Sequence, residues 1–259
     1  AGSGRPVTTA DLIHDVELSR RIQRFCAWCG PAFVVLLFGG WGLLGGFIPL
    51  IPPSDGAGEV AAAYAQNANL HRVGNLLGLI GIFLTVPFFF AISMQIRRTE
   101  RRVPSLAILQ FASGIIVTVV LIIPELLFIG GLFRTDRPAE LTRLVNDLSY
   151  VMLILPWPPI IGQLGALTVA IFSDTRDDRR ATPVFPRWFG FFNAWVAILL
   201  LPASMIIFFK TGPFAWTGVI GFWIPAAVFG VWYLVTTALL LRGIDEEYRS
   251  DLAVANTAG

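Results

Sequence analysis

Six long runs of apolar residues alternate with short polar segments along the chain. The runs cover residues 26–52, 73–96, 104–133, 148–172, 188–209 and 216–241. A helix rises about 1.5 Å per residue, so about 20 residues cross the roughly 30 Å hydrocarbon core of a bilayer. Each run is long enough for one crossing, and each is far longer than the roughly ten-residue strands of an outer-membrane barrel. The pattern therefore predicts six transmembrane helices.

Prolines occur in all six runs. Each one removes a backbone donor and crowds the carbonyl four residues earlier, which predicts kinked helices. The densest group is the PWPP sequence at residues 156–159, where we expect the fourth helix to be broken. The sequence thus predicts an all-α integral membrane protein, a bundle of six proline-kinked transmembrane helices.

Composition supports this fold class. Hydrophobic residues make up 55% of the chain and charged residues 14%, with a mean hydropathy of +0.70. These values lie outside the usual pattern of a soluble globular domain. Eighteen arginines against a single lysine suggest a GC-rich bacterial genome, so we expect a bacterial inner membrane.

The distribution of arginines predicts the orientation of the helices. Short loops with an excess of Lys and Arg stay in the cytoplasm. If both termini are cytoplasmic, the opposite side carries only Arg72, Arg134, Arg137, Arg143 and Lys210. The cytoplasmic side then carries Arg5, Arg20, Arg21, Arg24, Arg97, Arg98, Arg101, Arg102, Arg176, Arg179, Arg180, Arg187, Arg242 and Arg249. Basic clusters such as RRTERR therefore act as topology signals, and no nucleic-acid partner is expected.

Three segments follow from this topology. Residues 1–25 form a cytoplasmic N-terminal segment, which is either an interfacial helix or a partly ordered tail. This segment is polar and carries both charge signs, so it does not predict a cleavable signal peptide. Residues 26–242 form the transmembrane domain, and residues 243–259 form a flexible cytoplasmic tail.

Glycines and aromatic residues predict contacts within the bundle and with the membrane. Small residues at helical spacing let backbones approach closely, and we favour packing of the first two spans on each other over a homodimer face. The glycines concerned are Gly39, Gly42, Gly45, Gly46, Gly74, Gly78 and Gly81. Aromatic residues near the ends of the runs predict an interfacial belt, and they are Trp28, Tyr150, Trp188, Trp195 and Trp216.

Glu125 is the only charged residue inside the six runs, in the sequence IIPELLFIGG. Ionisable groups at membrane depth are rare and usually face the interior of the bundle. Helical spacing places Gly114, Thr118 and Glu125 on one face of the third span. Pro124 adds polarity because it leaves the carbonyl of Val120 without its usual helical partner.

Neighbouring spans bring further polar residues to the same external level. His71, Asn75, Gly78 and Thr85 share one face of the second span, next to Arg72. The fourth span begins with Arg143, Asn146, Asp147 and Tyr150. We take as candidate ligand-binding residues Glu125, His71, Arg72, Asn75, Asp147 and Tyr150.

Two interpretations of this cluster stay open. In the structural one, Arg72 or Arg143 pairs with an acidic partner, either Glu125 or Asp147, and so seals the bundle. In the functional one, the cluster lines a pocket open to the outer leaflet, where Glu125 holds a polar head group or relays a proton beside His71.

Metal and cofactor chemistry finds little support in the sequence. Cys26 and Cys29 have the spacing of a redox or metal motif, but a zinc site needs four ligands. The chain adds only His14 and His71, so we expect two buried apolar cysteines, no metal site and no cofactor. Phosphate loops, nucleophile elbows and HExxH motifs do not occur in it.

Three functional hypotheses remain. The first is a non-enzymatic membrane protein that binds or passes a small apolar or lipid-like molecule through a polar pocket near the external leaflet. The second is an accessory subunit of a larger membrane complex, with companion membrane subunits as partners. The third is an intramembrane enzyme that acts on a lipid or hydrocarbon, with Glu125 as acid or base. Membrane lipids are expected partners in each case.

Overall fold

The computed structural model describes residues 9–100, 104–174 and 184–257, and over these residues it is all-helical. Six arginines of the charge count lie outside the described residues, namely Arg5, Arg101, Arg102, Arg176, Arg179 and Arg180. The elements are α1 (Thr9–Val35), η1 (Leu36–Leu44), α2 (Ala57–Ala65), α3 (Ala68–Phe83), α4 (Thr85–Arg97), α5 (Ser105–Phe133), α6 (Ala139–Ile154), α7 (Pro158–Ser173), α8 (Arg187–Leu200), η2 (Leu201–Ile207), η3 (Val219–Trp223) and α9 (Ile224–Thr257).

Six helical stretches are long and apolar enough to cross a membrane, which confirms the number of spans. They are Ala10–Leu44, Ala68–Arg97, Ser105–Phe133, Ala139–Ser173, Arg187–Ile207 and Val219–Val254 within the described part of the chain. The chain is therefore a polytopic membrane protein. The cytoplasmic location of both termini stays a prediction from the arginine count.

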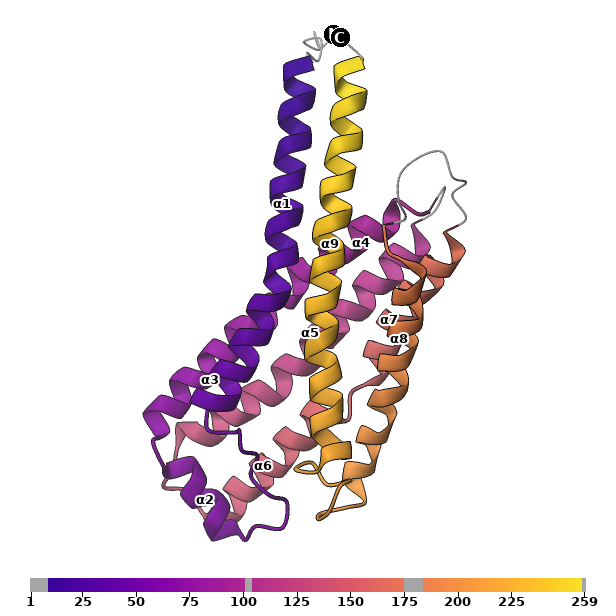
Figure 1. The fold of residues 1–259 in the computed structure, drawn as a ribbon. Coiled ribbons are helices and arrows are strands. Elements are labelled where there is room, and N and C mark those ends of the chain that lie inside the picture. The colour runs from indigo at the N-terminus through magenta and orange to yellow at the C-terminus, as the bar shows by residue number, and fades with distance from the viewer. Residues whose placement is uncertain (1–8, 101–103, 175–183, 258–259) are drawn as a thin grey trace, which may run out of the picture.

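Helices α1 and α9 lie side by side and project beyond the other helices at the end where both termini lie (Figure 1). We call this the terminal end, and the opposite end, which contains α2, the loop end. Residues 10–25 continue into the first span as one helix. The sequence had left two alternatives open for this segment, an interfacial helix and a partly ordered tail. Likewise, α9 runs on to Thr257, so residues 243–257 are helical where a flexible tail was predicted.

Charged and amide side chains join the projecting pair to the bundle. Asp245 of α9 accepts hydrogen bonds from Arg20 at 2.9 and 3.0 Å and from Arg24 at 2.8 and 2.9 Å. Nearby, Gln95 of α4 donates to Glu247 at 2.8 Å and to Gln23 at 2.7 Å. These polar contacts give Asp245 and Glu247 specific partners on α1 and α4, within the segment that was predicted to be a flexible tail.

Helical geometry is interrupted at several of the prolines. The fourth span is broken at residues 155–157, between α6 and α7, as the PWPP sequence predicts. The second span is interrupted at Leu84, three residues before Pro87, and α8 gives way to the 3₁₀-helix η2 next to Pro202. By contrast, α5 continues without interruption through Pro124.

The first two spans pack through glycines, which confirms the expected intramolecular contact. A Cβ atom built on Gly40 would lie 3.0 Å from the carbonyl oxygen of Gly74 and 3.0 Å from the amide nitrogen of Gly78. Only residues without side chains permit this approach of two backbones. Gly39 differs, because a Cβ atom there would meet no atom within 4 Å.

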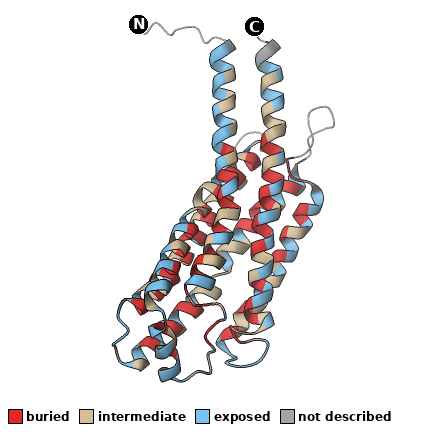
Figure 2. Ribbon diagram, turned by 60° about the vertical axis from the view of Figure 1, so that its left-hand side comes forward, coloured by how far each residue is buried: buried red, intermediate tan, exposed pale blue. Residues whose placement is uncertain are grey.

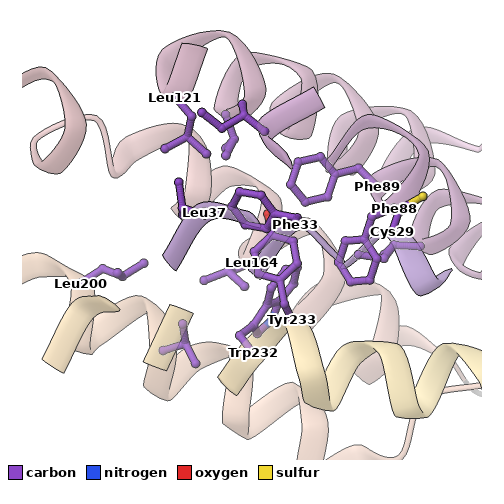
Figure 3. Close-up of a cluster of buried hydrophobic side chains, with 14 of the residues drawn as sticks. Cys29, Phe33, Leu37, Phe88, Phe89, Leu121, Leu164, Leu200, Trp232 and Tyr233 are labelled. Atoms are coloured by element: carbon purple, nitrogen blue, oxygen red, sulfur yellow. The ribbon is translucent and has the colours of Figure 1, made fainter. Parts of the chain in front are cut away.

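Aromatic rings fill the core where α1, α4 and α9 meet. Figure 3 shows Phe33, Phe88 and Tyr233 gathered with other buried apolar side chains. The ring of Tyr233 stacks on Phe88 with centroids 4.9 Å apart and lies 4.7 Å from Phe33. Buried residues line the inside of the bundle in Figure 2, whereas exposed residues cover its outer faces. Large apolar residues such as Ile80 and Phe83 are among those exposed, as a lipid-facing surface requires.

Two members of the predicted aromatic belt lie inside the protein instead. Tyr150 and Trp216 are buried and stack with centroids 5.2 Å apart and an interplanar angle of 13°. The indole nitrogen of Trp216 donates to the carbonyl of Ile51 at 2.8 Å. Trp28, Trp188 and Trp195 are exposed, as residues of a belt must be.

Candidate functional site

Glu125 lies inside the bundle, with 2% of its surface exposed. Its buried face of α5 also contains Gly114 and Thr118, which confirms that the three residues share one side of the helix. Thr118 and Thr85 form a hydrogen bond between their hydroxyls at 2.6 Å, so this face of α5 packs against the second span.

The carboxyl group of Glu125 occupies space that Gly78 leaves free. A Cβ atom built on Gly78 would lie 2.8 Å from Oε1 of Glu125 and 2.9 Å from Cβ of Trp41. Trp41 belongs to the π-helix η1. Residues from three elements therefore meet at one point: Trp41 from η1, Gly78 from α3 and Glu125 from α5.

Three buried polar atoms on these three elements have no hydrogen-bond partner among the described residues. They are Oε1 of Glu125, Nε1 of Trp41 and Oδ1 of Asn75. The other end of the Asn75 side chain is engaged, because Nδ2 donates to the carbonyl of His71 at 2.7 Å. A buried polar atom without a partner costs about 1–3 kcal/mol. We name Trp41, Asn75 and Glu125 the polar triad.

His71 lies against Gly46. Gly46 has a φ of +77°, and a Cβ atom there would collide with the imidazole ring. Glycine is thus required twice over, by the left-handed backbone and by the ring. The contact between His71 and the triad is a hydrogen bond from Asn75 to the backbone carbonyl of His71.

Arg72 does not form the ion pair that the structural interpretation expects. Its Nε donates to the carbonyl of Leu132 at 3.0 Å, and its Nη1 donates to Asn69 at 2.7 Å. The last carbonyls of α5 lack helical partners and attract this cation. Arg143 pairs with Glu140 at 3.3 Å, and no ion pair of Glu125 occurs within the described residues.

The candidate residues of α6, Asp147 and Tyr150, have hydrogen-bond partners of their own. Asp147 accepts from Asn146 at 3.4 Å, and the hydroxyl of Tyr150 accepts from the backbone amide of Ile51 at 3.3 Å. Phe128 contacts both sides, with ring centroids 5.2 Å from Tyr150 and 5.6 Å from Trp41. Among the six candidate residues, one hydrogen bond is seen, from Asn75 to the carbonyl of His71, whereas Arg72, Asp147 and Tyr150 bond to residues outside the candidate set.

A cavity of about 100 Å³ has Trp41 in its wall, and every residue that lines it is apolar or aromatic. Part of its wall comes from segments that depart from α-helical geometry, and the rest comes from regular α-helices. Trp41 comes from η1, Trp157 from the break between α6 and α7, Ala203 from η2 and Phe222 from η3. Leu121 of α5 lines it as well, and Figure 3 shows Leu37, Leu121 and Leu200 on three different helices.

Trp41 connects the cavity with the polar triad. It lines the cavity and also belongs to the triad. Leu121, another wall residue, precedes Glu125 by four residues, so the carboxyl group lies about one helical turn (about 5.4 Å) along α5. Trp41 was not among the residues predicted from the sequence. It could have been noticed as a tryptophan flanked by glycines in FGGWGLL, far from either end of its apolar run.

Comparisons of the chain with protein-family models, with curated proteins and with solved structures gave no match. The geometry of the cavity and the triad therefore carries the functional argument.

Proposed function

We propose that the protein binds a small apolar or lipid-like molecule in the cavity between η1, α5, the α6–α7 break, η2 and η3. The observation that carries this proposal is which segments of the chain line the cavity. Four interruptions of helical geometry, on different spans, converge on one apolar cavity. π-Helical segments are rare and frequently occur at functional sites.

The size of the cavity limits the ligand. An engineered cavity of about 150 Å³ in another protein binds benzene. A cavity of about 100 Å³ therefore suits a short hydrocarbon segment rather than a whole membrane lipid. It is partly open at its edge, which would let the rest of a longer chain extend into the bilayer.

Trp157 of the cavity wall links two of the segments that line the cavity. The indole nitrogen of Trp157 donates to the hydroxyl of Ser204 at 2.7 Å, which links the α6–α7 break to η2. Both of these segments contribute wall residues.

Filling the cavity tests the proposal. Ala226 lines it, whereas the next residue, Ala227, is exposed and does not. Ala226→Leu and Ala227→Leu add the same three carbons at adjacent positions of α9. The assay is labelling of the purified protein, in nanodiscs of phosphatidylcholine, by a diazirine-bearing dodecane, with the labelled residues located by mass spectrometry.

The expected result is strong labelling of cavity residues in the wild type and in Ala227→Leu, and its loss in Ala226→Leu. Equal labelling of the cavity in both variants would contradict the proposal. So would a wild-type pattern confined to lipid-facing residues.

A further inference from the structure

We propose that the part of the ligand inside the cavity is a single aromatic ring, and that Phe38 and Trp157 select this ring over the saturated chains of membrane lipids. This inference rests on the function proposed above and names the chemical class of its ligand. The class is a monocyclic aromatic hydrocarbon, either free or carried on an alkyl chain.

The bilayer supplies the competitor that this selection must overcome. Lipid tails are as apolar as the walls of the cavity, so moving a saturated chain from the membrane into it gains little hydrophobic free energy. Hydrogen bonds to the lining side chains do not provide the selection either. The indole N–H of Trp157 bonds to Ser204, and that of Trp41 is buried away from the cavity surface. Selection among apolar molecules therefore depends on the kind of surface that the wall presents.

The wall is rich in aromatic rings. Five of its fifteen residues are aromatic, which is a third of the wall, whereas aromatic residues make up 13% of the whole chain. The five are Phe38, Trp41, Trp157, Phe222 and Phe229. An offset-stacked or edge-to-face pair of rings gains roughly two- to ten-fold in affinity beyond the area that it buries. A saturated chain forms no such pair, so the wall favours a ring.

Two of the five wall rings lack an aromatic partner. Trp41, Phe222 and Phe229 each contact another ring of the protein, at centroid distances of 5.6, 5.3 and 5.0 Å. Phe38 and Trp157 make no ring–ring contact with any described residue. A ring in the cavity would give both of them a partner.

The cavity has the size of one ring. Its volume is about 100 Å³, and benzene occupies a cavity of about 150 Å³ in another protein. A cavity that holds one ring places that ring against the residues of its wall. The two wall rings are also held in position, because Trp157 donates to Ser204 at 2.7 Å and the ring of Phe38 lies 3.7 Å from a Cβ atom built on Gly230. Little ordering of the wall is therefore needed when the guest binds.

Competition against the diazirine-bearing dodecane separates this inference from the proposed function. Hexylbenzene, hexylcyclohexane and dodecane contain the same number of carbon atoms. Each is added to nanodiscs at the same mole fraction, and labelling of cavity residues is measured. We expect hexylbenzene to compete at least about five-fold better than hexylcyclohexane, because only its ring pairs with the rings of the wall.

Variants locate the rings that select the ligand. Trp157→Leu and Phe38→Leu each remove one ring but keep an apolar side chain, and each should lower the ratio of hexylbenzene to hexylcyclohexane competition by about two-fold or more. Trp157→Phe keeps a ring without the bond to Ser204 and should recover most of the ratio. The matched controls are Trp195→Leu and Phe191→Leu, because these two rings are exposed on α8 and do not line the cavity. They should keep the wild-type ratio. A ratio between two competitors on the same variant remains interpretable even where a variant lowers stability.

The outcomes are distinct. Equal competition by hexylbenzene and hexylcyclohexane would overturn the ring inference and leave the cavity function standing, whether or not both compete better than dodecane. An unchanged ratio in both Trp157→Leu and Phe38→Leu would overturn the assignment of the selection to these two rings. Failure of the probe to label the cavity at all would overturn both the inference and the proposed function.

Discussion

Replacing Gly78 with alanine is expected to force the new methyl group against the carboxyl group of Glu125. The contact is 2.8 Å to Oε1, below the separation of any ordinary carbon–oxygen contact, and a second contact of 2.9 Å meets Trp41. Overpacking of this kind costs about 1–3 kcal/mol. Alanine recovers up to about 1 kcal/mol through its higher helix propensity. The net loss in the free energy of unfolding should therefore be about 1–2 kcal/mol.

A double-mutant cycle isolates the contact between the two residues. Glu125→Ala removes the carboxyl group, so of the three nearest contacts of the Gly78→Ala methyl group only the one with Trp41 remains. The propensity gain is the same in both backgrounds and cancels. The two substitutions should therefore be less harmful together than their sum, by about 1–2 kcal/mol, the usual size for residues in contact.

The assay is reversible unfolding in mixed micelles, followed by circular dichroism. Gly39→Ala is the matched control, because a methyl group there meets no atom within 4 Å. This control should be neutral or stabilising, with no coupling to Glu125→Ala. A coupling energy within about 0.5 kcal/mol of zero for the Gly78 and Glu125 pair would refute the placement of the carboxyl group.

Three further predictions concern stability in the same assay. Gly46→Ala should destabilise more than Gly212→Ala, because both have a φ near +80° but only Gly46 also faces the ring of His71; equal losses would contradict that contact. Asp245→Asn should cost about 1 kcal/mol, because its ion pairs with α1 are partly exposed, and the loss should shrink at high salt. Gln110→Leu should be neutral or stabilising, because both polar atoms of this buried amide lack partners among the described residues; a loss above about 2 kcal/mol would reveal a polar partner.

The spans were predictable because their length and lack of charge depend on local sequence alone. The break at residues 155–157 was predictable for the same reason, since three prolines within four residues leave too few backbone donors for a continuous helix. The shared face of Thr118 and Glu125 followed from helical periodicity. Each of these inferences needs only neighbours in the chain.

Partners across the bundle were less predictable. Tyr150 and Trp216 lie near the ends of their runs, as belt residues do, yet they stack on each other inside the protein. Arg72 pairs with backbone carbonyls at the end of α5, although carboxylates were the obvious partners in the sequence. Tertiary packing decides such choices, and a hydropathy pattern does not contain it.

The cavity shows why the site itself could not be found from the sequence. Its walls come from residues more than 180 positions apart, between Trp41 and Phe222, and four of the wall segments depart from α-helical geometry. Each departure disturbs the hydrogen bonds of a helix in a medium where unsatisfied backbone groups are costly. One such departure is expected at any proline. Four that converge on one apolar cavity support the proposal that a ligand fills the cavity and offsets their cost.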